Sequence, residues 1–248
     1  MSTSQQTLLD HEIEHGRKLM REGAESVWNW SSPAGRKRAD RRAAFLVQAG
    51  KIASGDLALE IGCGTGLFSR KVFDLTGARI KAVDLSPELL LIARNSLEQR
   101  TGIEFTEEDA MHLSSKDCTF DVVFGSSILH HMVFDAALRE ILRVLKKRGR
   151  MVFAEPNMLN PQILIQKNIP FIKKRLGDSP DETAIVRWKL KKQMEELGFS
   201  NIRITPYDFL HPATPAAMIP FVDKAGRLIE KIPGLREIAG SVIIYAEK

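Results

Sequence analysis

The stretch that decides the fold is Leu57–Gly66, which reads LALEIGCGTG. Residues 57–61 form an apolar run typical of a buried strand, and a turn with glycine at every second position follows at once. Because glycine has no Cβ, such a turn lets a bound group lie against the backbone. A helix after the turn would point its free N–H groups at that group. The stretch therefore predicts a ligand site at the end of this strand.

The spacing of the glycines shows whether the turn matches a dinucleotide-binding site. Dinucleotide-binding turns follow the pattern G-x-G-x-x-G, with glycine or alanine at the sixth position for tight packing of helix on strand. Here the sixth position is Leu67, and the glycines follow the pattern G-x-G-x-G. An acidic residue, Glu60, stands two places before the first glycine. The turn is therefore a poor match to a dinucleotide site.

The rest of the chain alternates short β-type runs with amphipathic helices. This alternation predicts an α/β fold with a parallel sheet and helices on both faces. The last of the predicted helices would open with a capping box at Ser179–Glu182. Strands are expected over residues 57–61, 79–83, 103–106, 121–124, 150–154, 202–207 and 241–246, and helices over 67–75, 87–99, 134–146 and 179–197.

Further helices are expected outside this alternation. Ser32 and Pro33 suit the N-cap and first position of a helix that extends to Val47. Between the last two strands, a proline-rich insertion carries an apolar stripe from Phe221 to Ile232 at helical spacing. We expect an N-terminal helical cap and a main domain, with two insertions that cover a substrate. Their ranges are 1–50 for the cap, 51–248 for the domain, and 156–178 and 208–238 for the insertions.

Several stretches resemble, in order and spacing, the motifs of the class I S-adenosylmethionine-dependent methyltransferases. The small-molecule enzymes of the quinone-biosynthesis type are the most similar subgroup. A proline is common in the family where Lys147 stands, which is a small departure. The resemblance is close over residues 50–155 and topological over 180–248. The stretches that carry it are Leu57–Gly66, Lys81–Ser86, Glu107–Ala110, Phe120–Phe124 with Ser126–His131, and Arg143–Arg150.

The resemblance implies a doubly wound, seven-stranded, mostly parallel sheet in the strand order 3-2-1-4-5-7-6, with an antiparallel last strand. It also implies S-adenosylmethionine as the cofactor. In the family, an acid at the end of the second strand holds the ribose hydroxyls, a role that falls to Asp84 here. Asp109 and the backbone N–H of Ala110 would read the adenine. The cofactor-binding residues expected are Glu60, Gly62, Cys63, Gly64, Thr65, Gly66, Asp84, Leu85, Asp109, Ala110 and Ser126.

Some of these residues also have an ordinary structural explanation. The glycines could merely form a tight turn, Asp84 could be an acid at a helix N-terminus, and Asp109 could be a turn-forming residue. The concordant motifs favour cofactor binding for each of them. Glu60 could contact the cofactor or support the glycine loop from behind, and the sequence leaves both open.

Two histidines just past the fourth strand, His130 and His131, are the candidates for a general base. Imidazole titrates near pH ~6.5, so it can accept a proton at neutral pH. Some small-molecule O-methyltransferases of this class use a histidine here, and this pair resembles theirs. Adjacent side chains in a loop usually diverge, so we expect at most one of the two to point inward. Glu155, at the end of the fifth strand, could orient an imidazole or hold a substrate hydroxyl.

The composition disfavours several other classes of protein. Cys63 and Cys118 are too few for a disulfide framework or a cysteine-rich zinc site, and no cluster has the spacing of metal ligands. No apolar run reaches the ~18–20 residues that cross a bilayer, and the N-terminus lacks a signal-peptide core. These features favour a cytoplasmic protein with free thiols. Amino-methylating nucleic-acid enzymes carry an Asn/Asp-Pro-Pro-aromatic run after the fourth strand, with which they hold a flipped base. This sequence has Gly125–Ile128 there instead, which disfavours that class of enzyme.

The net charge is +5, and basic residues gather over Arg36–Arg42. A helix spreads such charges around its cylinder, so a solvated surface is the simplest interpretation. Binding of RNA or of an anionic small substrate is the alternative. Trp28 and Trp30 could line a pocket or anchor the N-terminal helix.

The Phe221–Ile232 stripe is expected to pack on the domain, although it could cover an apolar substrate or touch a membrane. Its polar face mixes acidic and basic residues, which argues against a membrane.

The resemblance implies an enzyme that transfers a methyl group to oxygen or carbon of a small molecule, apolar or anionic. One alternative is an RNA methyltransferase that uses the basic helix. The other is a module that binds the cofactor without catalysis. The acceptor and the oligomeric state are not predicted, because acceptor pockets are built by variable segments of the fold.

Overall fold

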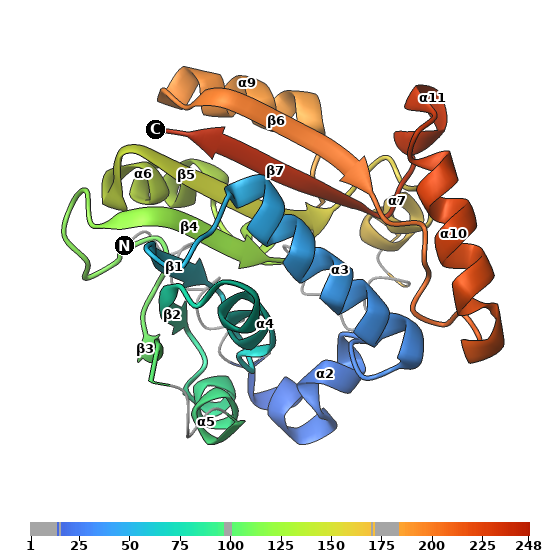
Figure 1. The fold of residues 1–248 in the computed structure, drawn as a ribbon, viewed down its shortest axis with the longest axis horizontal. Helices are drawn as coiled ribbons and strands as arrows, with labels where there is room; N and C mark the ends of the chain where they lie inside the picture. Colours follow the sequence, from blue (N-terminus) through green and yellow to red (C-terminus); the bar gives the residue numbers. More distant parts are fainter. Residues whose placement is uncertain (1–13, 15, 97–100, 170, 172–183) are drawn as a thin grey trace.

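The computed structural model describes residues 14, 16–96, 101–169, 171 and 184–248. Its centre is a seven-stranded sheet in the order β3-β2-β1-β4-β5-β7-β6 (Figure 1). Neighbouring strands from β3 to β5 are parallel, whereas β7 is antiparallel to both β5 and β6. The expected fold class, strand order and antiparallel last strand are confirmed. The strands are β1 (Leu57–Ile61), β2 (Arg79–Asp84), β3 (Ile103–Glu107), β4 (Phe120–Ser126), β5 (Leu145–Pro156), β6 (Ser200–Tyr207) and β7 (Ser241–Glu247).

Helices cover both faces of the sheet. On one face, α3 (Pro33–Gly50), α4 (Leu67–Thr76) and α5 (Pro87–Ser96) bury residues such as Leu46, Val72 and Leu90 against it. On the other face, α6 (Phe134–Val144) and α9 (Arg187–Leu197) bury Ile141 and Met194. Figure 1 shows α3 lying across the strands, from the centre of the sheet toward α10 (Ile219–Ile229). The core therefore consists of two apolar layers separated by the central strands.

The N-terminal part begins its main helix where the sequence predicts it. Ser32 is the N-cap of α3, and its side chain accepts a hydrogen bond from the Gly35 N–H, with Pro33 at the first helical position. A short helix, α2 (Ala24–Val27), precedes it. Because α3 packs on β5 and β7 as well as on α4, it forms part of the core of the main domain.

Two predicted boundaries are wrong. The helix expected to reach Lys146 ends at Val144, because Leu145 pairs with Phe120 of β4 and is fully buried as the first residue of β5. The helix expected over 179–197 begins at Arg187, since Ile185 is extended and bridges to Asn157. The predicted capping box, 179–182, lies outside the described residues, as do 97–99 at the end of the predicted helix over 87–99.

The β6–β7 insertion is helical, as expected, but its apolar stripe is not packed as expected. A 3-10 turn, η2 (Ala216–Met218), leads into α10, and α11 (Pro233–Arg236) follows. Ile219 and Val222 pack against Ala34 and Leu210. In contrast, the side chains of Phe221 and Leu228 are exposed. The physical reason is that α10 packs through another face, which carries Ile219, Val222 and Gly226. A Cβ on Gly226 would lie 3.1 Å from Cβ of Phe209.

Candidate cofactor and acceptor site

A cavity of about 670 Å³ opens at the carboxyl ends of the parallel strands, where ligands of open α/β sheets bind. Its volume lies within the usual range for small-molecule sites, ~300–1,000 Å³. The glycine loop and the ends of β2 and β4 form its floor, and segments from 27–30, α7 (Pro161–Asn168) and 209–213 complete its walls. The expected site residues that line it are Gly62, Cys63, Gly64, Thr65, Asp84, Leu85, Asp109, Ala110, Ser126, His130 and His131.

The glycine loop has a backbone that side chains rarely tolerate. Gly62, Gly64 and Gly66 have φ angles of 67°, 51° and 76°, in the left-handed region that favours glycine. A Cβ on Gly62 would lie 2.2 Å from Cγ1 of Ile128, and one on Gly64 would lie 2.9 Å from the Trp28 ring. The loop is therefore held open to the cavity, with protein side chains against it on the other sides.

Gly66 has a different surrounding from the first two glycines. A Cβ there would meet Phe105 at 3.1 Å and Ala93 at 3.2 Å. Gly66 does not line the cavity. It also serves as the N-cap of α4, so it brings that helix close to the neighbouring elements and directs its N-terminus at the cavity.

Asp84 joins the end of β2 to the glycine loop. Its Oδ2 accepts a hydrogen bond from the Gly64 N–H at 2.7 Å, and its Oδ1 accepts one from the Ser86 N–H at 2.9 Å. A carboxylate oxygen has a second lone pair, so this fixed carboxylate can also accept hydrogen bonds from the vicinal hydroxyls of a ribose. The arrangement fits the cofactor that the motif implies.

Asp109 has local partners as well as a place in the wall of the cavity. Its Oδ1 accepts from the Met111 N–H at 2.8 Å, which forms a turn, and its Oδ2 lies 2.8 Å from Nδ1 of His112. The neighbouring Ala110 is buried. The structure thus shows the turn-forming arrangement of Asp109, and the same residue lines the cavity.

Glu60 lies behind the glycine loop and does not line the cavity. It is fully buried and accepts a hydrogen bond from the Ser69 hydroxyl at the start of α4. Burial raises the pKa of this carboxyl to about 8, in spite of the hydrogen bond from Ser69. Of the two roles left open by the sequence, its position matches support of the loop from behind.

His130 and His131 both line the cavity. They belong to a 3-10 turn, η1 (Leu129–His131), which places their rings 4.2 Å apart. Nδ1 of His130 lies 2.7 Å from Oε2 of Glu155, and both residues are buried. The other carboxylate oxygen of Glu155 accepts from the N–H groups of Ile128 and Leu129.

These contacts determine the charge of Glu155. Burial alone would raise its pKa, but the hydrogen bonds from His130 and from the two backbone N–H groups hold the pKa below its ordinary value. An ionised carboxylate only accepts hydrogen bonds, so Nδ1 of His130 carries the proton. In neutral His130 the lone pair is therefore on Nε2. Glu155 itself does not line the cavity and can act only through the histidine.

Arg42 is a functional candidate that the sequence analysis missed. It is buried, and it donates to the hydroxyls of Ser126, Ser127 and Ser241 over 2.7–3.0 Å. Ser126 and Ser127 line the cavity at the end of β4. The helical spacing held a signal, because Arg42 shares a face of α3 with the buried Ala39 and Leu46.

Three other basic residues of α3 bind carboxylates of the β6–β7 insertion, namely Lys37, Arg38 and Arg41. Arg36 is exposed and donates to the Ser31 carbonyl. Arg38 donates to Asp208 at 2.8 Å, and Arg41 donates to both oxygens of Glu230 at 2.9 and 2.5 Å. The simplest interpretation of this basic run, a solvated helix face, is therefore wrong for these positions. The RNA methyltransferase reading also loses its support, because these guanidinium groups already bind carboxylates.

The two tryptophans before α3 have different surroundings. Trp28 lines the cavity and packs on the glycine loop at Gly64. Trp30 also borders the cavity, packs edge-on against Phe68, and lies beneath the guanidinium groups of Arg38 and Arg42. Both expected roles, lining a pocket and anchoring the N-terminal segment, are thus combined.

Within the described residues, no group of three or more His, Cys, Asp or Glu side chains could hold a metal ion. No described helix is both long enough and apolar enough to cross a membrane. Cys63 is buried and Cys118 is exposed, and both are free thiols.

Comparison with known proteins agrees with this geometry. A family model described as a methyltransferase domain matches residues 59–153. A demethylmenaquinone methyltransferase of Thermobifida fusca is 33% identical over 67% of this chain and 73% of its own length. A ubiquinone biosynthesis O-methyltransferase of Paraburkholderia xenovorans is 37% identical over 40% of this chain and 44% of its own.

A solved structure supports the fold. A methyltransferase of Thermotoga maritima superposes with a TM-score of 0.64 at 20% identity, covering 93% of this chain and 98% of that one. The matched family model spans the glycine loop, Asp84, Asp109 and the histidine turn. The chain belongs to the class I S-adenosylmethionine-dependent methyltransferases, and it is an enzyme of this family whose cofactor is S-adenosylmethionine.

Proposed function

We propose that this enzyme methylates a ring-bearing, quinone-type small molecule at a hydroxyl oxygen or a ring carbon. The observation that carries the proposal is a single cavity that contains both the cofactor loop and the His130–Glu155 pair. Two similar proteins are named for demethylmenaquinone and ubiquinone biosynthesis, which supports this class of acceptor.

The floor of the cavity would hold the cofactor. Asp84 would accept hydrogen bonds from the ribose hydroxyls, and the backbone N–H of Ala110 with Asp109 would contact the adenine. The Gly62–Thr65 backbone, at the N-terminus of α4, would lie against the methionine part. When bound, S-adenosylmethionine supplies a methyl group activated by a sulfonium. The protein then has to align the acceptor with that methyl group, and this orientation can lower the barrier by ~7–11 kcal/mol.

His130 is the proposed general base. Glu155 holds its Nδ1–H, so Nε2 would accept the proton that an acceptor hydroxyl loses as its oxygen takes the methyl group. His131, whose ring lies 4.2 Å from that of His130 at a tilt of 43°, would contact the acceptor ring. The same pair would also stabilise an acceptor that reacts at carbon after loss of its hydroxyl proton.

The acceptor would be enclosed by segments outside the motifs. We propose that the N-terminal cap and the parts of both insertions that line the cavity cover the acceptor. Ile163, Phe209 and Leu210 contribute apolar surface, and Arg38 contributes a cation. This mixture suits a largely apolar ring with an ionisable hydroxyl. The charge of Arg38 is shared with Asp208, which favours a neutral or weakly acidic acceptor over a multiply charged one.

The test measures methyl transfer from labelled S-adenosylmethionine to a reduced, short-chain demethylmenaquinone and to a hydroxylated ubiquinone precursor. His130→Gln and Glu155→Gln should lower kcat by ~10²–10⁴-fold, as expected for loss of a general base, with cofactor affinity unchanged. Glu195→Gln, on the exposed face of α9, is the matched control. Cofactor binding without transfer to either acceptor would contradict the proposed acceptor class. Transfer that His130→Gln leaves intact would contradict the proposed base.

A further inference from the structure

The outer side of α10 carries an apolar surface that nothing in the described residues covers. We call Met218, Phe221, Leu228 and Ile232 the α10 surface. Phe221 is 69% exposed and Leu228 is 55% exposed, and the other two are about half exposed. Their helical spacing places them along one side of this segment. Exposed apolar patches of this kind mark sites of interaction with a partner or a membrane.

Cations border the α10 surface. Lys224 lies one turn from both Phe221 and Leu228, and Lys231 follows Leu228 by one turn. Both lysines are exposed. Residues three and four apart are neighbours on a helix, so these ammonium groups flank the apolar side chains rather than lying opposite them.

The acidic residues of the insertion face inward. Glu230 is bound by both terminal nitrogens of Arg41, and its side chain is 14% exposed. Asp223 lies 3.4 Å from Lys37 and 3.2 Å from Arg227, and its side chain is 11% exposed. Asp208 is bound by Arg38. Residues 208–238 contain as many acidic as basic side chains, yet the face toward solvent is cationic.

This arrangement overturns the sequence argument against a membrane. Acidic and basic residues are mixed along the sequence of the insertion, but they are separated in space. The α3 helix binds Asp208, Asp223 and Glu230, and Arg187 binds Glu237. An exposed apolar stripe flanked by lysines is the pattern of helices that lie in the interface of a bilayer. We propose that the α10 surface docks this enzyme on an anionic lipid bilayer.

Charge also distinguishes the bilayer from a second copy of the chain. Two α10 surfaces packed face to face would bring the lysines of both copies together, with the nearby carboxylates already bound by α3. Such like charges repel, whereas anionic lipid headgroups attract each lysine by ~1 kcal/mol, about a fivefold gain in affinity. The observed charges therefore complement lipid and oppose self-association.

Docking would bring the cavity to the bilayer surface. Residues 209–213 line the cavity and lead directly into α10. In α7, Ile163 lines the cavity, whereas Leu164 and Ile165 are about half exposed. Figure 1 shows α7, α10 and α11 grouped at one end of the molecule. A route from lipid to cavity for an apolar acceptor rests on the proposed function, whereas the docking itself does not.

The test is sedimentation of the full chain with vesicles of equal parts phosphatidylcholine and phosphatidylglycerol, compared with phosphatidylcholine alone. We expect binding to the anionic vesicles that weakens with added salt. The double variant Phe221→Ser, Leu228→Ser should lose it. Lys224→Glu with Lys231→Glu should weaken it by at least ~25-fold, since each lysine contributes about fivefold.

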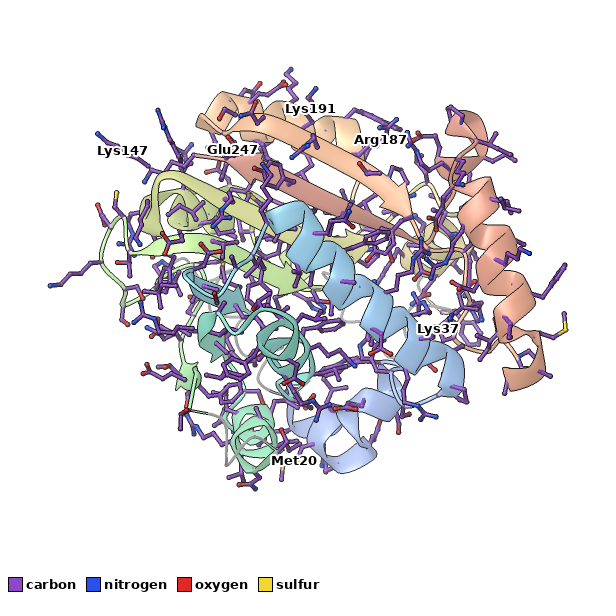
Figure 2. All side chains as sticks on the ribbon, in the orientation of Figure 1. Met20, Lys37, Lys147, Arg187, Lys191 and Glu247 are labelled. Atoms are coloured by element: carbon purple, nitrogen blue, oxygen red, sulfur yellow. The ribbon has the colours of Figure 1, made fainter. Side chains whose placement is uncertain are left out.

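Matched controls distinguish the contribution of the α10 surface to vesicle binding from general effects of polarity and charge. Leu75→Ser with Leu91→Ser alters two residues of similar exposure on α4 and α5, and should bind like the wild type. Lys116→Glu with Lys147→Glu makes the same change in net charge away from α10, where Figure 2 places Lys147 at the opposite end of the molecule. Unchanged cofactor binding in every variant verifies folding, without reference to the acceptor.

Three results would overturn the proposal. The first is absence of vesicle binding at low ionic strength, and the second is equal binding by the α10 double variant and the wild type. The third is a dimer in sedimentation-velocity runs that disappears in the Phe221→Ser, Leu228→Ser variant, since it would assign the surface to a second copy.

Discussion

The glycine loop and the β6–β7 insertion border the same cavity, but they are held in place by different kinds of contact. The loop is fixed by backbone N–H groups and short-range partners, such as Asp84 with Gly64 and Ser86. The insertion is fixed by side-chain ion pairs that join residues far apart in sequence, such as Arg41 with Glu230. One region is a local motif, and the other exists only when α3 and the insertion meet.

This difference explains how the two regions can serve different purposes. A cofactor shared by a whole family needs the same backbone geometry in each member, and glycines with positive φ provide it. An acceptor varies between members, and a wall held by paired side chains can change composition without disturbing the loop. The following predictions test whether the two regions depend on these different forces.

The largest effect should come from the buried carboxyl behind the loop. Folding raises the pKa of Glu60 from 4.5 to about 8, so the folded state holds this proton more tightly than the unfolded chain. The free energy of unfolding should therefore fall as the pH rises from about 4.5 to about 8, by on the order of 5 kcal/mol. Glu60→Gln keeps an acceptor for Ser69 and should lack this decline.

Urea unfolding across this pH range measures the effect. Glu104→Gln, which changes an exposed residue of β3, should follow the wild type. A constant difference in stability between Glu60→Gln and the wild type at acidic and alkaline pH would show that the buried carboxyl does not titrate as described.

The next largest effect concerns the side chain that joins the loop to β2. Asp84→Ala removes the acceptor of two backbone N–H groups and the expected partner of the ribose. Hydrogen bonds to a charged group contribute ~1.5–3 kcal/mol, so affinity for S-adenosylmethionine should fall by about 10- to 100-fold. Titration calorimetry measures this directly. Asp135→Ala, at the exposed start of α6, is the control, and an equal loss in both variants would rule out a specific role for Asp84.

The smallest effect is a coupling energy in the insertion. A double-mutant cycle with Arg38→Met and Asp208→Asn should give a coupling of ~1–2 kcal/mol in the free energy of unfolding, since the pair is largely buried. The exposed pair Arg139–Asp135 should give a much smaller coupling, because solvent screens its charges. Similar couplings in the two cycles would mean that long-range ion pairs do not hold the insertion in place.

The local and long-range parts of the molecule also differ in how far the sequence predicts them. The cofactor loop followed from the motif at Leu57–Gly66, and the α/β class followed from the regular alternation after it, because glycine spacing and strand periodicity are local properties. The strand order came from the resemblance to the methyltransferase family. The partners of Arg38 and Arg42 were not predictable in this way. Their charges are visible in the sequence, but Asp208 and Ser241 lie far along the chain, and only the packing of α3 on the sheet brings them together.

The histidine turn falls between these cases. The positions of His130, His131 and Glu155 at strand ends were enough to group them as candidates. The close contact between the two imidazole rings was not predicted, because it depends on η1, a 3-10 turn with no strong sequence signal. Boundaries at Leu145 and Arg187 failed for a similar reason, since tertiary pairing overrode local propensity at both.

The strand order has a consequence for synthesis on the ribosome. In the finished sheet β6 pairs with β7, which comes later in the chain. While the chain is being made, the part from β1 to β5 can assemble first, but β6 has no strand to join until β7 has emerged and inserted between it and β5. The edge that carries the insertion must therefore complete its folding last, and until then β5 offers an open edge to which a chaperone can bind.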